Sequence, residues 1–204
     1  INEAPTEVTL SSTTIAENSA ADTVVGTLSA TDEDASNTHS FTLSGADAAK
    51  FAIVGNELRL VSSLDHETDT DADTNGDYEV TVTASDSDGV ASGSATNFTI
   101  TVGNVNEAPT AVTLSSTTIA ENSTVNTVVG TLSATDEDDS DTHSFTLGGT
   151  DSGKFKVIDD NGVKKLALNS GVTLDYEGGT TSYDITVTAT DSGNETTSSA
   201  TPFT

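Results

Sequence analysis

Apolar and polar residues alternate along several short stretches of this chain. In residues 78–84 every second side chain is apolar, and residues 98–102 follow the same rule. Such alternation places one face of a strand against a core and leaves the other face in water. No apolar pattern with the helical period persists for three turns, and Thr and Val are abundant. The pattern therefore predicts an all-β fold of antiparallel sandwich type.

The chain consists of two copies of one unit. Residues 10–19 recur unchanged as residues 114–123, a shift of 104 residues, which indicates domain-sized repeats. Seven strands in about 100 residues fit an immunoglobulin-like Greek-key sandwich. In the first unit we expect the strands near residues 6–10, 23–30, 40–44, 50–54, 57–61, 78–85 and 95–102.

The repeat boundaries predict three segments. The first unit covers residues 1–103, a linker covers residues 104–109, and the second unit covers residues 110–204. Phe203-Thr204 matches Phe98-Thr99, so we expect the last strand of the second unit to be truncated. The chain is therefore interpreted as part of a longer array of repeats.

The charge of the chain excludes several classes of partner. It carries 33 acidic and 6 basic side chains, which gives a formal net charge of -27. So few cations cannot neutralise a row of phosphates, and an anionic membrane surface would repel the chain. There is no apolar run long enough to span a bilayer, and without Cys there are no disulfides, catalytic thiols or thiolate zinc sites. We therefore expect neither nucleic-acid binding nor direct membrane insertion.

Acidic residues gather where the expected strands end. They are Glu17, Asp32, Asp34, Asp65, Glu67 and Asp86 in the first unit, and Glu121, Asp136, Asp138, Asp175, Glu177 and Asp191 in the second. Carboxylates are hard oxygen donors, and Ca²⁺ takes about 6–8 of these in a tolerant geometry. Alternate spacing lets two carboxylates leave one side of an extended segment and share a cation. The pattern therefore predicts calcium binding, which would also offset the repulsion among these groups.

The order of these motifs resembles the cadherin repeat. That family carries a Glu near its start, an Asp-x-Glu, an acidic linker ending in Pro, an Asp-x-Asp and a later single Asp. Glu17, Asp65-His66-Glu67, residues 104–109, Asp136-Glu137-Asp138 and Asp191 follow in the same order. The resemblance covers essentially the whole chain, in two copies. The Asn-Glu-Ala-Pro linker and the background rich in Thr, Ser and Asp are similar to the cadherin-like repeats of large bacterial surface adhesins.

The resemblance implies that Ca²⁺ ions bind at the junction between the two units. The implied ligands are Glu17, Asp65, Glu67, Val105 (backbone), Asn106, Glu107, Ala108 (backbone), Asp136, Asp138 and Asp191. Two half-sites would face repeats outside this chain. They comprise Asn2, Glu3, Asp32, Asp34 and Asp86 at one end, and Glu121, Asp175 and Glu177 at the other.

The linker departs from the family pattern in three ways. It is one residue shorter than the vertebrate motif, Asn104 replaces the first Asp, and Glu107 replaces the linker Asp. We therefore expect one ion to be lost or to bind more weakly. The chain has no Trp, which makes the exchanged-Trp adhesive mode of vertebrate cadherins impossible here.

A separate acidic segment occurs only in the first unit. Asp71, Asp73, Asn75 and Gly76 match the first half of an EF-hand loop. However, the twelfth position is Val82 instead of Glu, and no helices are expected on either side. A partial calcium loop and a solvated acidic loop both remain open, and the solvated loop is favoured.

The function implied by the resemblance is calcium-dependent cell adhesion at the cell surface, outside the cell. The partners would be neighbouring repeats of the same chain and a homophilic protein partner. A passive spacer that projects a distal binding domain and a module that binds cell-surface glycans are the alternatives. No nucleophile, base and orienting group recur together, so no enzyme activity is expected.

Overall fold

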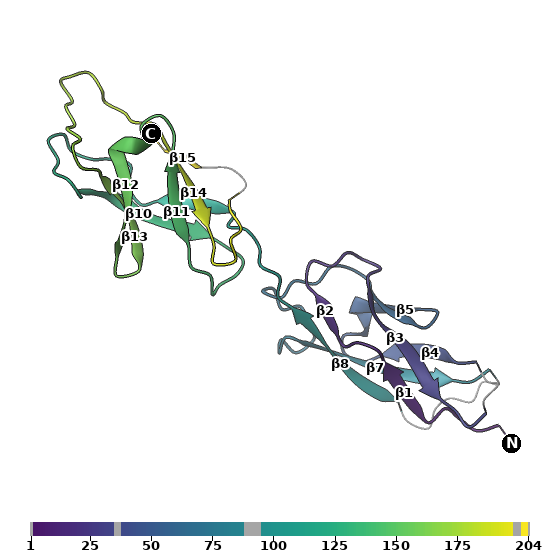
Figure 1. The fold of residues 1–204 in the computed structure, drawn as a ribbon. Coiled ribbons are helices and arrows are strands. Elements are labelled where there is room, and N and C mark those ends of the chain that lie inside the picture. Colours follow the sequence, from purple (N-terminus) through teal and green to yellow (C-terminus); the bar gives the residue numbers. More distant parts are fainter. Residues whose placement is uncertain (1, 35–37, 88–94, 198–200, 204) are drawn as a thin grey trace. The chain divides into compact units, whose positions relative to one another are not determined.

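Alternating side chains build a two-sheet sandwich in each of two units, residues 1–105 and 106–204. The computed structural model describes residues 2–34, 38–87, 95–197 and 201–203 (Figure 1). The division between the units falls inside the predicted linker, residues 104–109. Within the described residues, no helix has the length and apolar character needed to cross a bilayer.

Unit 1 contains two four-stranded sheets. One sheet has the order β1-β3-β6-β5 and the other has the order β2-β8-β7-β4. The strands are β1 (Glu7–Leu10), β2 (Thr14–Ala16), β3 (Val24–Thr31), β4 (Ser40–Ser44), β5 (Phe51–Val54), β6 (Glu57–Leu60), β7 (Asp77–Ser85) and β8 (Thr96–Gly103), with a short 3-10 helix η1 (Ala48–Lys50) before β5. All pairings are antiparallel except that of β2 with β8, which is parallel.

The core of unit 1 is built by the inward faces of these strands. Tyr78, Val80, Val82 and Ala84 on β7 are at most 2% exposed, as the alternation predicted. The predicted sandwich is confirmed, and each of the seven expected strands of this unit is present. Sequence analysis missed β2, because three residues are too few to show a period of two.

Unit 2 repeats the sandwich with the sheet orders β12-β13-β10-β9 and β11-β14-β15. The strands are β9 (Ala111–Leu114), β10 (Val128–Thr135), β11 (Ser144–Gly148), β12 (Phe155–Asp160), β13 (Val163–Leu168), β14 (Ile185–Thr190) and β15 (Thr201–Phe203), with η2 (Ser152–Lys154) before β12. Its core is centred on Leu166, Leu168 and Val187, all at most 1% exposed. The two units therefore fold into the same kind of sandwich with the same kind of apolar core.

Gly130 shows how tightly the start of β10 packs against the preceding loop. The register with β13 shifts between Val128 and Gly130, and an added Cβ would lie 2.8 Å from the backbone N and O of Ser116. We expect Gly130→Ala to lower the free energy of unfolding of unit 2 by about 1–3 kcal/mol, the usual cost of overpacking. Denaturant unfolding followed by circular dichroism measures this change.

Gly153→Ala in the same unit is the matched control, because an added Cβ there meets nothing within 4 Å. Equal stabilities of the two variants would contradict the packing argument.

Candidate metal centres

The acidic groups of unit 1 divide between its two ends. Strands β7 and β8 are antiparallel, so the residues after Ser85 and after Gly103 emerge at opposite ends of the sheet. We call these ends the N-terminal pole and the C-terminal pole. In unit 1 the N-terminal pole comprises Asn2, Glu3, Asp32, Asp34 and Asp86, and the C-terminal pole comprises Glu17, Asp65, Glu67, Asn104 and Val105.

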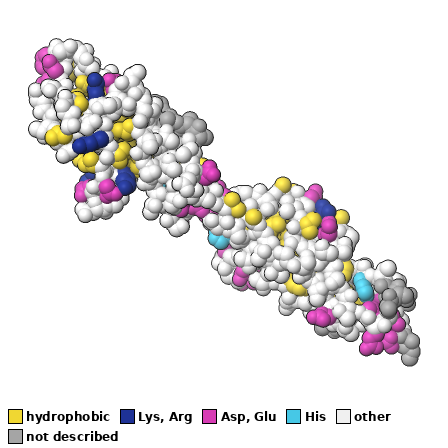
Figure 2. All heavy atoms as spheres, viewed as in Figure 1, with side chains coloured by type: hydrophobic (Ala, Val, Ile, Leu, Met, Phe, Trp, Pro, Cys, Tyr) yellow, Lys and Arg dark blue, Asp and Glu magenta, His cyan; other side chains and the backbone are white. Residues whose placement is uncertain are grey.

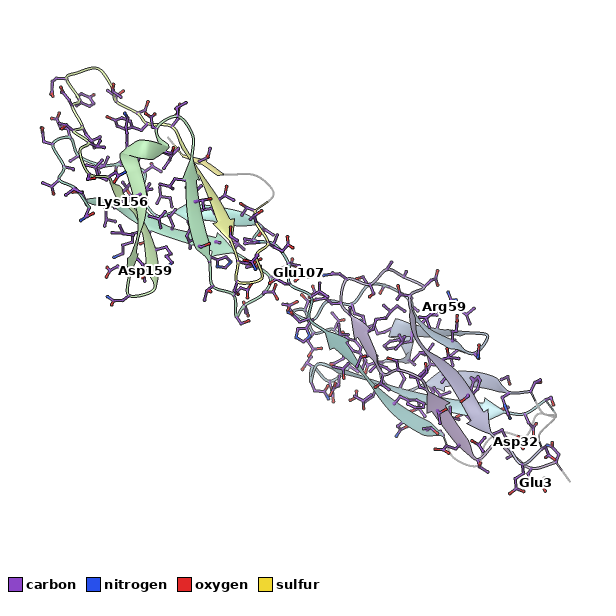
Figure 3. The ribbon with its side chains drawn as sticks, in the orientation of Figure 1. Glu3, Asp32, Arg59, Glu107, Lys156 and Asp159 are labelled. Atoms are coloured by element: carbon purple, nitrogen blue, oxygen red, sulfur yellow. The ribbon has the colours of Figure 1, made fainter. Side chains whose placement is uncertain are left out.

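Side-chain oxygens at the N-terminal pole of unit 1 hold the first residues of the chain. Asn2 Nδ2 donates to Asp86 Oδ2 at 2.6 Å, and the Glu3 N–H donates to Asp34 Oδ2 at 2.9 Å. Glu3 and Asp32 lie at the same end of the unit in Figure 3, where acidic side chains gather on the surface in Figure 2. Burial and then the neighbouring carboxylates raise the pKa of Glu3. Negative charge is therefore crowded at this pole.

The N-terminal pole of unit 2 repeats these contacts residue for residue. Asn106 Nδ2 donates to Asp191 Oδ2 at 3.0 Å, and the Glu107 N–H donates to Asp138 Oδ2 at 2.9 Å. Asp138 and Asp191 are 7% and 5% exposed. His143 Nε2 lies 2.7 Å from Asp136 Oδ2. The two units thus share one arrangement, in which an Asn amide and a Glu N–H donate to two aspartates. Both aspartates are buried in unit 2, whereas in unit 1 Asp86 is buried and Asp34 is half-buried.

Three carboxylates of unit 2 converge at this pole. One oxygen from each of Asp136, Asp141 and Asp191 lies within 4.8 Å of the other two. The Asp136 side chain is only 4% exposed. Its Oδ1 and the Oδ2 of Asp141 are buried, and neither has a hydrogen-bond partner among the described residues. Buried oxygens without donors are costly unless a cation approaches them, so this donor set fits a hard divalent ion.

The C-terminal pole of unit 1 is organised around Glu17, which is 3% exposed. Its Oε2 accepts the His66 N–H at 2.7 Å, and its Oε1 accepts the Val105 N–H at 2.6 Å. Hydrogen bonds from backbone N–H groups to a carboxylate are charge-assisted and stronger than neutral ones. Glu17 therefore holds two segments in place: the Asp65-His66-Glu67 motif, and the chain directly after β8.

Two further carboxylates, those of Asp65 and Glu67, belong to the same pole, and Glu67 lies close to Glu17. Asp65 Oδ1 accepts the N–H groups of Glu67 and Thr68, both at 3.0 Å, and the Thr68 N–H is the main cause that lowers the pKa of Asp65. Asn104 Nδ2 donates to Glu67 Oε1 at 2.8 Å. Burial and the adjacent Glu17 carboxylate nevertheless raise the pKa of Glu67. The crowding of two carboxylates is the electrostatic condition that a bound cation relieves.

The C-terminal pole of unit 2 keeps the same residue types in a looser arrangement. Carboxylate oxygens of Glu121, Asp175 and Glu177 lie within 4.8 Å of one another, and all three residues are exposed. Glu121 Oε2 accepts the Tyr176 N–H at 3.0 Å, which corresponds to the contact between Glu17 and His66. Glu17 is buried and Glu121 is exposed, although the sequences around them are identical.

The acidic loop of unit 1 has an explanation without metal. Asp71 Oδ1 accepts the N–H groups of Asp73 and Thr74, and its Oδ2 accepts those of Asn75 and Gly76. Asp71 is 7% exposed; desolvation acts to raise its pKa, but these four donors outweigh it and lower the pKa. Asn75 Nδ2 in turn donates to Asp73 Oδ2 at 3.2 Å. These backbone donors hold the loop around a buried Asp71 without an ion, so the loop is not simply solvated, and calcium binding there stays a prediction.

The structure thus brings the predicted ligand residues together at the poles of their own units. Sequence analysis missed Asp141, because the corresponding residue of unit 1 is Asn37, which lies outside the described residues. Sequence analysis also assigned no role to His39 and His143, each of which contacts an aspartate of the N-terminal pole of its own unit. The signal was present, since both His residues follow that aspartate by seven positions.

Comparison with known proteins identifies the sandwich. The sequence model of the Cadherin domain matches residues 11–103 and 115–204. Human Protocadherin-24 EC1-2 is 25% identical, with a TM-score of 0.72 over 99% of this chain and 93% of that chain. Drosophila N-cadherin EC1-4 is 23% identical, with a TM-score of 0.71 over 98% of this chain and 48% of that chain.

The extracellular domain of Protocadherin GammaB4 is 24% identical, with a TM-score of 0.70 over 100% of this chain. This chain spans 32% of that protein and about half of three further protocadherin fragments. Among curated proteins, none matches this sequence significantly. At such identities the solved structures establish the fold.

The Asp71 contacts lead to a pH-dependent prediction. Because the folded-state pKa lies below the ordinary value of about 3.9, the ionised carboxylate stabilises unit 1 above that pH, and the contribution is lost as the pH falls. We expect Asp71→Asn to lower the melting temperature at pH 7, and the difference from the unchanged protein to shrink toward zero near pH 2. Thermal unfolding between pH 2 and 7 measures it.

Asp73→Asn serves as the control, since this exposed residue removes the same charge from the same loop. A loss of stability in Asp71→Asn that does not change with pH would show that its charge is not what holds the loop.

Proposed function

This chain belongs to the cadherin family, whose domains are extracellular adhesion modules, and we propose that its two units are joined and stiffened by Ca²⁺. The observation that carries the proposal is the N-terminal pole of unit 2. There, buried carboxylate oxygens of Asp136 and Asp141 converge without a donor among the described residues. Oxygen donors in this number suit Ca²⁺, whereas zinc would want imidazole or thiolate ligands.

The two half-sets of ligands are joined by the chain itself. In unit 1 the Val105 N–H is bound by Glu17, and in unit 2 the next residue, Asn106, is bound to Asp191. We infer that the ion-binding junction draws on both. Its proposed ligands are Glu17, Asp65, Glu67, the Val105 backbone, Asn106, Glu107, Asp136, Asp138, Asp141 and Asp191.

The two outer poles are proposed as half-sites. Asn2, Glu3, Asp32, Asp34 and Asp86 form one, and Glu121, Asp175 and Glu177 form the other. Each offers carboxylates from one unit alone, so we expect weaker binding there than at the junction. Affinity for Ca²⁺ rises with the number and charge of the oxygen ligands.

The residues of the junction would bind Ca²⁺ and keep the chain on either side of it in place. Bound Ca²⁺ supplies the positive charge that cancels repulsion among the carboxylates. Glu17 and Asp138 anchor the chain on either side of the junction through backbone N–H groups, so bending there would have to pull ligands off a shared ion. Cation binding to the folded state alone also stabilises it, by about 2.7 kcal/mol at a hundredfold excess over Kd.

The adhesive role is proposed to be homophilic, through contacts between copies of these repeats at the cell surface. A passive spacer is the second candidate, and the near-identity of the two units favours it, since repeated modules suit an extended array. Neither the described residues nor the comparisons support a glycan partner. An origin in a bacterial surface adhesin stays a prediction.

Calcium binding is tested by a pair of neighbouring variants. We expect Asp138→Asn to weaken Ca²⁺ binding at the junction about tenfold or more, equivalent to at least about 1.4 kcal/mol, because a buried charged ligand is lost. Asp139→Asn removes the same charge from an exposed neighbour and should bind Ca²⁺ as the unchanged chain does. Calorimetric titration of metal-free protein gives both affinities. If all three proteins show no saturable calcium binding, the proposed function is wrong.

The homophilic role is tested by sedimentation of the full chain at micromolar concentration, with Ca²⁺ and with chelator. A dimer that forms only with Ca²⁺ is the expected result. A monomer under both conditions, in protein that binds Ca²⁺ by calorimetry, would assign the chain to the spacer role.

A further inference from the structure

Most of the positive charge of this chain lies on one hairpin of unit 2. Four of the six basic residues fall within residues 154–165, which span the end of η2, β12 and the start of β13. The other two, Lys50 and Arg59, belong to unit 1. In a chain with a net charge of -27, this hairpin is therefore the place where an acidic partner would be attracted.

The outward side of this hairpin carries lysines among apolar side chains. Phe155 and Val157 pack in the core of unit 2, so alternation places the residues next to them on the opposite side of the sheet. Val128 and Val163 on that outward side are each 44% exposed. Lysine and apolar side chains lie close together on the surface of unit 2 in Figure 2. We call this side the lysine face, and it comprises Val128, Lys156, Ile158, Asp160, Val163 and Lys165.

The charge of the lysine face is only partly neutralised within unit 2. Lys165 Nζ lies 2.6 Å from Asp160 Oδ2, whereas Lys156 (Figure 3) has no ion pair among the described residues. In unit 1 the place of Lys165 is taken by Glu57, which pairs with Arg59 at 2.5 Å. An unpaired cation on this side of the sheet is therefore a property of unit 2.

Unit 1 carries a feature of the opposite sign that unit 2 lacks. Its acidic loop, residues 68–77, contains four aspartates, of which Asp69 and Asp73 are exposed. The equivalent residues 178–182 contain no acidic residue. Two otherwise similar units thus differ at two surfaces, and these surfaces are complementary in charge.

The acidic loop is held in one conformation by hydrogen bonds. Asp71 accepts four backbone N–H groups from inside the loop. The buried Asp47 accepts the Ala72 N–H at 2.8 Å and the Glu79 N–H at 2.9 Å, which ties the loop to β7. A loop that is already ordered loses little conformational entropy when its exposed carboxylates meet a partner.

We propose that the lysine face of unit 2 docks on the acidic loop of unit 1 in a second copy of this chain. This contact rests on the proposed homophilic role and specifies which surfaces of the two copies meet. Lys156 and Lys165 would pair with Asp69 and Asp73, and the exposed valines of the lysine face would be covered. Two lysine faces would repel each other, as would two acidic loops, so charge selects the unequal pairing.

The contact is expected to form only with Ca²⁺. Two chains with a net charge of -27 repel each other, and Ca²⁺ bound at the poles would lower this repulsion. The short-range pairing of lysine face and acidic loop would then decide how the two copies meet.

A pair of charge reversals tests the lysine face, by sedimentation of the full chain with Ca²⁺ at micromolar concentration. Lys156→Glu should weaken the dimer tenfold or more, because it places like charges together. Lys164→Glu is the matched control, since it changes the net charge equally on the opposite side of β13. It should change the dissociation constant less than threefold.

The reverse change tests the acidic loop. Asp73→Lys makes the net charge less negative, so a long-range effect alone would strengthen the dimer, whereas loss of the local pairing should weaken it tenfold or more. An equal mixture of the Asp73→Lys and Lys156→Glu chains should dimerise about as well as the unchanged chain, because each face then meets a loop of opposite charge. Recovery in the mixture also shows that both variants are folded.

The outcomes separate this contact from the homophilic role itself. A Ca²⁺-dependent dimer that Lys156→Glu and Lys164→Glu weaken equally, or a mixture that does not recover, would overturn the docking of face on loop and leave the homophilic role standing. An unchanged chain that stays monomeric with Ca²⁺ would overturn both.

Discussion

Hydrogen bonds from backbone N–H groups to buried and half-buried carboxylates hold the loops at the ends of the strands of this protein. Glu17 accepts two such bonds, Asp71 accepts four, and Asp34 and Asp138 each accept one from the segment that enters their unit. Each bond places an acidic side chain at a defined position on the rim of a sandwich. A chain with a net charge of -27 thus uses its carboxylates as structural acceptors before any ligand is considered.

These hydrogen bonds satisfy only some of the carboxylate oxygens at the poles. The remaining oxygens carry negative charge that no donor among the described residues offsets. Asp71 has donors on both oxygens, so its charge is neutralised locally by peptide dipoles. Asp136 is contacted at Oδ2 by His143, and its Oδ1 is buried close to the carboxylates of Asp141 and Asp191, without a donor among the described residues. A divalent cation is the species whose charge and size suit the remaining acceptors.

The fold could be predicted from sequence because the alternation of apolar and polar residues within each strand already specifies which face is buried. Alternation along residues 78–84 requires one buried face, and β7 has one. The cadherin resemblance named the acidic residues in order, and the structure groups them by pole. The sequence could not reveal that Asp141 lies close to Asp136 and Asp191, because this cluster combines two loops about fifty residues apart in sequence. The contact between His143 and Asp136 was missed for a different reason, since a lone His in a β-rich chain more often packs than binds.

The contrast between Glu17 and Glu121 shows where local sequence stops deciding structure. Both residues lie in the same ten-residue sequence, and both accept an N–H from the motif that carries the next two carboxylates. Only Glu17 also receives the chain that leaves β8, and only Glu17 is buried. In unit 1 a contact between residues 88 positions apart in sequence therefore accompanies the burial of Glu17, which the local acidic motif alone does not specify. Because a preorganised ligand set loses less entropy when an ion binds, this contact favours cation binding at the C-terminal pole of unit 1.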